Sequence, residues 1–372
     1  MCLFYSMERL DIVLQECQMR PTFSGRAAFT RNLFLAAGFA VGVLIYARLF
    51  CVGTKAALAQ SENPSQSARA EAAKPAGQKK DDTPQTIAKS SAHHFDRVLI
   101  IVLENGDYEV ALKDKNLAAL AAHGASFSNF HALFHPSYPN YLAMIAGTDF
   151  GVGEKPRLLA DMQVDFPDDA DHQTVADRLI ASGLDFKNYV EELPEGNCPY
   201  KISTQKAANS NTGGYVRRHV PFLSFREVQE KWCDHVVRVD SARDDNYFVR
   251  DAKQGLVAYS FYSPNRNNDG HDTGVTFAAQ WLENFLDKKF PESLRKGTLI
   301  VVTFDESDHN ADNRIFTLFL GDMVKDASQQ DSKVLDRHYT HYSLLRTIED
   351  NFGLKPLAAG DRDAVPITGI WK

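Results

Sequence analysis

An excess of positive charge is one thing that this sequence lacks. Its 372 residues include 41 lysines and arginines against 48 aspartates and glutamates, which gives a formal net charge of -7. Proteins that are dedicated to binding DNA or RNA usually carry a basic face or stripe. We therefore expect no nucleic-acid partner.

Cysteine is also scarce. Of the five cysteines, Cys2, Cys17 and Cys51 lie within residues 1–59, which we interpret below as a signal, and Cys198 and Cys233 are left for the rest of the chain. In an exported protein, an oxidising compartment would let these two form a disulfide. The bridge would tie down the polar stretch between them, which has few apolar residues to hold it.

The amino-terminal apolar run, residues 33–47, is short for a membrane span, because a spanning helix needs about twenty apolar residues. Arginines precede it, and Ala57-Leu58-Ala59 supplies a small-x-small cleavage pattern. We interpret residues 1–59 as a secretory signal, which predicts a periplasmic or secreted protein. The alternative is an uncleaved membrane anchor through residues 33–47.

The chain beyond the signal divides into a linker and one large domain. Residues 60–92 are rich in Ala, Ser, Gln, Lys, Asp and Pro and show no apolar periodicity, which is typical of a flexible linker. The folded domain is expected over residues 93–372, which is long enough to bury a substantial core.

Strand patterns alternate with helical patterns along this domain. Runs of β-branched and aromatic residues predict strands buried on both faces at 98–103, 256–262 and 299–304. Further strands are expected near 125–130, 186–190 and 314–320, and helices near 116–123, 139–147, 174–182, 273–288 and 340–352. In the helix at 273–288, Phe277, Trp281 and Phe285 should face the core. The alternation predicts an α/β domain with a mostly parallel sheet.

Polar side chains follow the three most apolar strands at the point where each ends. Asp305-Glu306 come directly after 299–304, Glu104-Asn105 come after 98–103, and Asn265 to Asp272 come after 256–262. One acidic strand end would be an ordinary solvated turn. In open α/β sheets, however, ligands bind just beyond the carboxyl ends of the strands. The repetition therefore favours a binding site.

Ser137 stands next to the expected start of a helix, since Pro139 suits the first turn and Gly147 suits the end. Together with the side chains of Glu104, Asn105, Asp305 and Glu306, it offers only oxygen atoms. Ca²⁺, Mg²⁺ and Mn²⁺ prefer such ligands, whereas zinc normally recruits His or Cys. We expect one divalent ion. A metal beside a serine at a helix amino terminus is typical of phosphoryl transfer, with Ser137 attacking phosphorus and the phosphoserine then being hydrolysed.

Five segments between about Arg97 and Gly353 also carry a familiar pattern. They are Val102–Asn105, His135–Tyr141, Pro264–Asp272, Thr303–Glu306 and His341–Glu349. In this order they resemble the motifs of the phosphoesterase family of acid phosphatases and bacterial phospholipases C, within the alkaline phosphatase-like superfamily. The resemblance implies a three-layer α/β/α sandwich, with Glu104, Asn105, Asp305 and Glu306 as metal ligands and Ser137 as nucleophile.

Two departures from the phospholipase pattern favour a compact phosphatase. Phospholipase members commonly have threonine at the nucleophile and an additional carboxy-terminal module. This sequence has Ser137, and it ends about twenty residues after its last matched segment.

The remaining polar residues of the matched segments divide into a proton donor and substrate contacts. His271 lies between a strand and a helix, so it could protonate the leaving oxygen or bind phosphate. We assign substrate binding to His135, Asn140, Asp269 and His341. Alternatively, the histidines position loops, Asn140 caps its helix, and Asp269 with Asp272 orients His271 or binds a second ion. The other histidines of the domain are expected to be structural, namely His123, His131, His219 and His235.

The first hypothesis is an exported, metal-dependent phosphomonoesterase that acts on small phosphate esters. A second keeps the site and changes the substrate to a phosphodiester, a phospholipid headgroup or a phosphoinositide monoester. A third, of another class, is an exported binding protein whose acidic cluster holds a structural ion.

Overall fold

The computed structural model describes residues 93–161, 163–195, 214–308 and 310–372, all within one folded unit. The expected signal (1–59), the linker (60–92) and Cys198 lie outside the described residues. Cys233 is buried and disulfide-bonded. Its pairing with Cys198 stays a prediction. None of the helices that the structure describes is long and apolar enough to cross a membrane.

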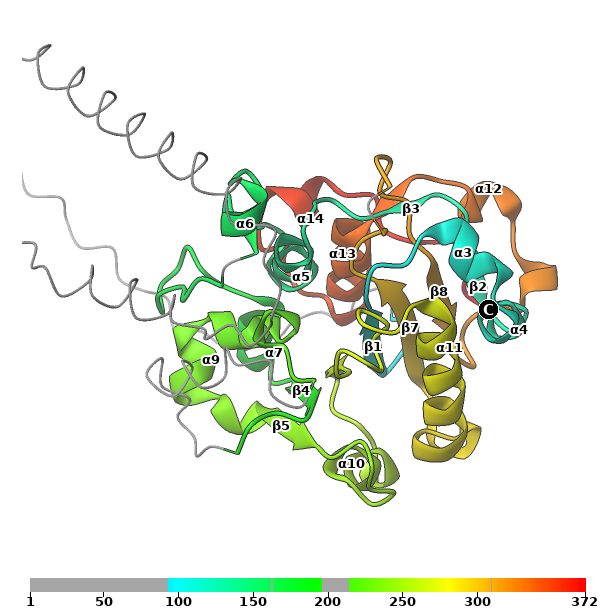
Figure 1. The fold of residues 1–372 in the computed structure, drawn as a ribbon, viewed down its shortest axis with the longest axis horizontal. Coiled ribbons are helices and arrows are strands. Elements are labelled where there is room, and N and C mark those ends of the chain that lie inside the picture. Colours follow the sequence, from blue (N-terminus) through cyan, green and yellow to red (C-terminus); the bar gives the residue numbers. More distant parts are fainter. Residues whose placement is uncertain (1–92, 162, 196–213, 309) are drawn as a thin grey trace, which may run out of the picture. The chain divides into compact units, whose positions relative to one another are not determined.

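A seven-stranded sheet forms the centre of the domain, in the order β2-β8-β7-β1-β6-β4-β5 (Figure 1). All seven side chains of β7 are buried, as are six of the seven in β1. The runs of Val, Leu and Ile at these two positions therefore form central strands, as their sequence predicts. The strands are β1 (Arg97–Leu103), β2 (Ala125–Phe127), β4 (Phe186–Glu191), β5 (Val236–Val239), β6 (Tyr259–Ser263), β7 (Thr298–Phe304) and β8 (Thr317–Leu320).

The predicted mostly parallel sheet is confirmed. Five strands run parallel to one another, namely β7, β1, β6, β4 and β5. The strand β8 lies antiparallel between β7 and β2. The expected strand at 125–130 is divided in two, because β3 (Phe130–His131) leaves the sheet to pair with β9 (Tyr339–Thr340). The parallel strands place the ends of β1, β6 and β7 at one edge, which is where the polar clusters follow.

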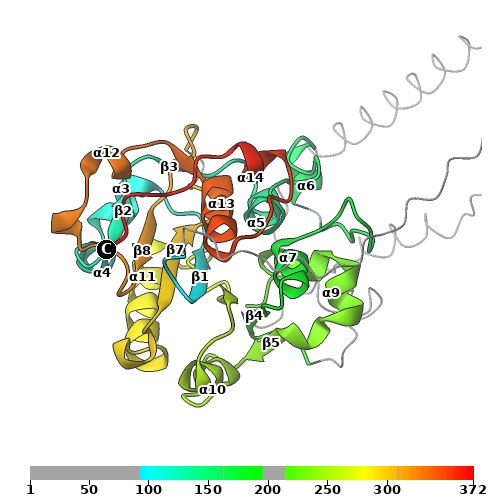
Figure 2. The ribbon, with the colours of Figure 1, turned by 180° about the vertical axis from the view of Figure 1, so that it is seen from behind.

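The helices form a layer on each side of the sheet. Crossovers between parallel strands are right-handed in nearly all proteins, and with this strand order the rule puts α3, α4, α10 and α11 on one face and α5, α7 and α9 on the other. Accordingly α11 contacts α3 and α4, whereas α5 contacts α7 and α13. The helices α5, α7, α9 and α13 can be followed in Figure 2, which shows the molecule from behind. The result is the expected α/β/α sandwich.

Helix boundaries agree with the sequence at strong end signals. Gly147 caps the carboxyl end of α5 and Gly353 caps that of α13, and both glycines have the left-handed conformation. The helices are α3 (Tyr108–Lys113), α4 (Lys115–Ala121), α5 (Ser137–Ala146), α6 (Arg157–Ala160), α7 (Val175–Ala181), α9 (Arg226–Lys231), α10 (Tyr247–Gln254), α11 (Val275–Asn284), α12 (Ser332–Leu335), α13 (His341–Phe352) and α14 (Ala359–Asp363).

One expected core face is wrong. Phe277 on α11 is 47% exposed, although Phe285 is buried and Trp281 packs against the core. The helix changes to a π-helical turn over Phe285–Lys289. In a regular α-helix each step of four residues rotates the side chain by about 40° beyond a full turn, so Phe277 points in a different direction from Phe285 and reaches solvent.

Candidate active site

The ends of β1 and β7 bring the predicted acids together. Backbone hydrogen bonds fix the two ends: the Asp305 N–H donates to the Leu103 carbonyl at 2.9 Å, and the Gly106 N–H donates to the Glu306 carbonyl at 3.0 Å. A β-carbon on Gly106 would lie 2.2 Å from the Phe304 ring, so only glycine allows this approach. Glu104, Asp305 and Glu306 are all buried as a result.

Ser137 is the first residue of α5, and its hydroxyl points between two of these acids. Its Oγ lies 3.1 Å from Glu104 Oε2 and 3.1 Å from Glu306 Oε1. One hydroxyl proton can serve only one of these acceptors at a time. The free N–H groups of the first helical turn lie beside the same hydroxyl. The site thus joins a serine hydroxyl, a helix amino terminus and a pair of carboxylates.

Placing three carboxyl groups together is electrostatically unfavourable. Burial, with the neighbouring Glu104 and Glu306 carboxylates, raises the pKa of Asp305 well above its usual range. Burial and Glu104 likewise raise the pKa of Glu306. Burial would do the same to Glu104, but its ion pair with His219 prevails and lowers the pKa to about 2.

A divalent cation fits this group of residues. Asp305 Oδ1 accepts a hydrogen bond from the Asn105 N–H at 3.1 Å, while the buried Oδ2 has no hydrogen-bond partner among the described residues. Asn105 has a positive φ of 55° and lines the cavity beside Glu306. The donor atoms are all oxygens, which suit a hard cation. A cation there would also offset the repulsion between the carboxylates.

His219, which we expected to be structural, contacts the acid cluster directly. Its Nε2 lies 3.0 Å from Glu104 Oε1 and its Nδ1 lies 3.1 Å from Asp269 Oδ2. The ring stacks on Tyr141, whose hydroxyl also donates to Glu104 at 2.7 Å. These contacts leave Glu104 Oε2 for Ser137.

Glu104, His219 and Asp269 are also close enough together to hold a metal ion. With a carboxylate near each ring nitrogen, however, the arrangement equally suits a protonated imidazole that donates from Nδ1 to Asp269 and forms an ion pair with Glu104. The two carboxylates raise the pKa of His219 to about 9, against the effect of its burial.

Three of the residues assigned to substrate binding are turned away from the open cavity. Asn140 is buried, accepts from the Leu133 and Phe134 N–H groups, and donates to the Phe134 carbonyl, so it fixes the loop before Ser137. Asp269 is buried against His219. His341 is buried, and its Nε2 lies 2.8 Å from the Asp305 carbonyl. Its burial lowers the pKa to about 4, so the neutral ring positions the end of β7.

His135, unlike these three, contacts the side chain of Glu306 beside Ser137. Its Nδ1 contacts Glu306 Oε2, and its Nε2 lies 3.2 Å from the Asn310 carbonyl. The ring therefore holds the Glu306 carboxylate from the side opposite Ser137.

His271 lies at the open side of the site, as its position between β6 and α11 predicts. Its Nδ1 lies 2.8 Å from Asp272 Oδ1, and its Nε2 faces Arg218 at 3.4 Å. Its backbone N–H donates to Asp269 at 2.8 Å. Asp272 and Asp269 thus set the direction in which the ring points, with Nε2 available to a bound molecule.

These side chains line a cavity of about 520 Å³, which is large enough for a small organic phosphate. The residues of its wall come from the ends of β1, β6 and β7, from the start of α5, from α6 and the residue after it, and from the 3-10 turn Arg217–His219. They are Asn105, Pro136, Ser137, Arg157, Leu158, Asp161, Arg218, Gly270, His271, Asp272, Gly274, Glu306 and Asp308.

Three residues at this site have no local signal in the sequence. Arg218 and His219 lie on a short 3-10 turn (Arg217–His219), and Asp161 follows the four-residue helix α6. None of the three follows a strand or stands in a matched segment. Their approach to Ser137 depends on the path of the chain between α5 and β4 and between β4 and β5.

Comparison with known proteins supplies independent information. A model of the phosphoesterase family matches residues 108–355. A probable acid phosphatase of Kluyveromyces lactis is 33% identical over 273 residues, which cover 73% of this chain and 61% of that protein. A phosphate-repressible acid phosphatase of Penicillium chrysogenum is also 33% identical, over 72% of this chain and 61% of that protein. The chain therefore spans about three fifths of the length of these relatives.

A bacterial relative is covered more completely. A phosphatidylinositol-3-phosphatase of Mycobacterium tuberculosis is 30% identical over 288 residues, which cover 77% of this chain and 86% of that protein. Among solved structures, a protein in the alkaline phosphatase superfamily from Vibrio parahaemolyticus aligns with a TM-score of 0.49 and 15% identity, over 77% of this chain and 76% of that one.

Proposed function

Because the chain belongs to the phosphoesterase family, we propose that it hydrolyses phosphomonoesters through a phosphoserine formed on Ser137. The observation that carries the proposal is the position of the Ser137 hydroxyl, 3.1 Å from both Glu104 and Glu306 at the start of α5. A residue that only stabilised the fold would not need to place a hydroxyl between two buried acids and beside an open cavity.

The first step transfers the phosphoryl group to the protein. Ser137 Oγ forms a bond to phosphorus as the bond to the leaving oxygen breaks, and the hydroxyl proton passes to Glu306, which is a stronger base than Glu104. The N–H groups at the start of α5 bind phosphate oxygens. His271, turned toward the cavity by Asp272, gives a proton from Nε2 to the leaving oxygen.

The second step releases phosphate. His271, now without that proton, accepts one from a water molecule that attacks phosphorus, and the bond to Ser137 Oγ breaks. The serine recovers its proton from the carboxylate, so the protein returns to its starting state. A divalent cation held by Glu104, Asn105, Asp305 and Glu306 would lower the pKa of the serine hydroxyl and balance the charge of the phosphate.

The decisive experiment is Ser137→Ala with p-nitrophenyl phosphate as substrate. We expect activity to fall to the background rate, at least about a thousandfold, because no other hydroxyl replaces the nucleophile. The melting temperature should stay within a few degrees of the parent, which separates loss of chemistry from loss of the fold. Full activity in the variant would contradict the mechanism.

A phosphoinositide monoester is the second candidate substrate, favoured by the relative named for phosphatidylinositol-3-phosphate hydrolysis, most of whose length the chain covers. Comparing p-nitrophenyl phosphate, its bis-ester, p-nitrophenyl phosphorylcholine and phosphoinositide vesicles separates a phosphomonoesterase from a phospholipase C or phosphodiesterase. A binding protein would hydrolyse none of them and would show only metal-dependent stability.

Export to the periplasm or the medium is part of the same proposal, with anchoring through residues 33–47 as the alternative. The disulfide at Cys233 supports an oxidising compartment. Cell fractionation followed by sequencing of the mature amino terminus tests it. A protein found in the cytosol with residues 1–59 intact would overturn it.

A further inference from the structure

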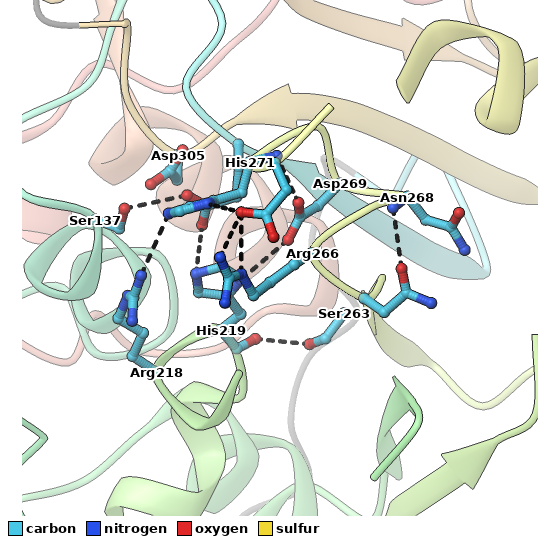
Figure 3. A network of polar contacts seen from close by, with 12 residues as sticks. Ser137, Arg218, His219, Ser263, Arg266, Asn268, Asp269, His271 and Asp305 are labelled. Carbon is cyan, nitrogen blue, oxygen red and sulfur yellow. Dashed lines mark hydrogen bonds and ion pairs between the residues drawn. The ribbon is translucent and has the colours of Figure 1, made fainter. Parts of the chain in front are cut away.

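Arg218 is the cation of the 3-10 turn that faces the cavity. Its neighbour Arg217 points the other way and is buried, where it donates to Gln163, Asp165 and the Leu223 carbonyl. The Arg218 side chain is 22% exposed and lines the same cavity as Ser137 and His271. Figure 3 shows it reaching toward the His271 ring on the side of Ser137.

The guanidinium is held by one edge and open at the other. Its Nε lies 3.3 Å from Asp161 Oδ1, which anchors the side chain to the segment after α6. Its Nη2 lies 3.4 Å from His271 Nε2, which is longer than a good hydrogen bond. A phosphate oxygen between Ser137 and His271 would offer this nitrogen a stronger, charge-assisted contact.

The charge around the cavity shows why such a cation is needed. Its wall includes the carboxylates of Asp161, Asp272, Glu306 and Asp308, which repel an incoming phosphate. A bound divalent cation would stabilise the negative charge on the phosphate oxygen nearest Ser137, but not on the others. The two arginines of the wall are Arg157 and Arg218. Arg218 is the one that contacts His271, the residue we place at the leaving oxygen.

From this geometry we propose that Arg218 binds the phosphoryl group and makes the site selective for dianionic phosphomonoesters over phosphodiesters. A monoester has three non-bridging oxygens and up to two negative charges, whereas a diester has two such oxygens and one charge. A planar guanidinium recognises a pair of phosphate oxygens. Arg218 distinguishes the monoester from the diester by binding its additional oxygen and negative charge. The inference rests on the function proposed above and specifies its substrate class.

The first test compares Arg218→Met with the matched control Arg250→Met. Arg250 also pairs with an aspartate, Asp245, but lies exposed on α10. For Arg218→Met, kcat/KM for p-nitrophenyl phosphate should fall roughly 10- to 100-fold, the usual cost of a lost hydrogen bond to a charged group. The value for the bis-ester should fall less than about threefold, so the ratio of the two should change at least several-fold. Arg250→Met should change neither.

A second test reads binding without turnover. Inorganic phosphate should raise the melting temperature of the parent protein and of Arg250→Met in the presence of Mg²⁺, Mn²⁺ or Ca²⁺. The shift should be absent in Arg218→Met and reduced in Arg218→Lys, which keeps the charge but not the planar fork. Arg218→Lys also serves if the methionine variant does not fold.

The outcomes separate this inference from the proposed function. Equal losses for monoester and diester, or an unchanged phosphate shift in both Arg218 variants, would overturn the role of Arg218 while the parent remained an active phosphatase. A parent protein that hydrolyses neither ester would refute the proposed function. The phosphate-induced shift would then still decide whether Arg218 binds phosphate.

Discussion

Ser137 and His271 approach the cavity from different layers of the fold, and each is oriented by neighbouring acids. Ser137 has Glu104 and Glu306 at 3.1 Å. His271 has Asp272 at 2.8 Å on Nδ1 and its own N–H on Asp269. In the proposed mechanism, these acid contacts orient Ser137 for attack and His271 for protonation of the leaving oxygen.

The role of His271 as a proton donor predicts a dependence on the leaving group. In His271→Gln, hydrolysis of an alkyl phosphate should slow by about 10²- to 10⁴-fold, because an alkoxide leaves poorly without a proton. Hydrolysis of p-nitrophenyl phosphate should slow much less, since nitrophenolate is stable unprotonated. Steady-state rates on the two substrates measure this. Equal losses on both would instead assign His271 to phosphate binding.

The acids at the strand ends could be predicted because the signal is local. An apolar run that ends on Asp305-Glu306 is visible within eight residues, and parallel strands put all such ends at one edge. Asn140 and His341 lie in segments that suggest substrate binding just as strongly. Their side chains instead contact the backbone, Asn140 in the loop before Ser137 and His341 at the end of β7. The direction in which a side chain points depends on tertiary packing, which a short stretch of sequence does not reveal.

At the level of elements, the packing of α13 on α14 buries an acidic pair away from the cavity. Glu349 on α13 and Asp361 on α14 are both fully buried, and Asp361 accepts hydrogen bonds from the Leu357 and Ala358 N–H groups. Burial and the Asp361 carboxylate raise the pKa of Glu349 to about 10. Glu349 is consequently neutral in the folded protein near pH 7.

This pair predicts how stability changes with pH. The unfolded chain releases the Glu349 proton near pH 4.5 and the folded protein releases it near pH 10, so the folded state holds more protons between these values. Its stability should therefore fall as pH rises through that window, by roughly 3 kcal/mol from this group by pH 7. Glu349→Gln should flatten the slope in denaturant melts at several pH values. Asp350→Asn, half-exposed on the same helix, should leave the slope in place.

Elements were predictable in proportion to the strength of their own signals. β1, β7 and α13 have long apolar runs or clear end residues, and their predicted bounds agree within a residue or two. The turn with Arg218 and His219 has neither period nor strand end, although it supplies two groups of the site. The exposed Phe277 shows a second limit, because an i, i+4, i+8 spacing does not reveal which side chains at the start of α11 the neighbouring elements cover.

For the molecule as a whole, the proposed cation site at Glu104, Asp305 and Glu306 predicts that stability depends on cation binding. A chelator should lower the melting temperature by several degrees, and Mg²⁺, Mn²⁺ or Ca²⁺ should restore it, because ligand at about a hundred times its Kd contributes about 2.7 kcal/mol. Calorimetry or dye-monitored melting measures the shift without any assay of activity.

The variant Asp305→Asn distinguishes this coupling from a general salt effect. It removes one of three mutually repelling carboxylates, so the chelated variant should melt at least as high as the chelated parent, while its response to the cations should be lost. Asp245→Asn, in an exposed ion pair with Arg243, should respond like the parent. A cation response that survives in Asp305→Asn would remove Asp305 from the proposed ligands.

The tie between the ends of β1 and β7 also has a consequence for folding kinetics. The hydrogen bond from Asn105 to Asp305 joins positions 200 residues apart in the sequence. Contacts of such long range form late, because closing a large loop costs entropy before any contact is gained. A partly folded chain without β7 in place would lack Asp305 and Glu306, two of the three acids of the cluster. The rate at which a refolding chain gains its cation affinity should therefore report the last docking step of the central sheet.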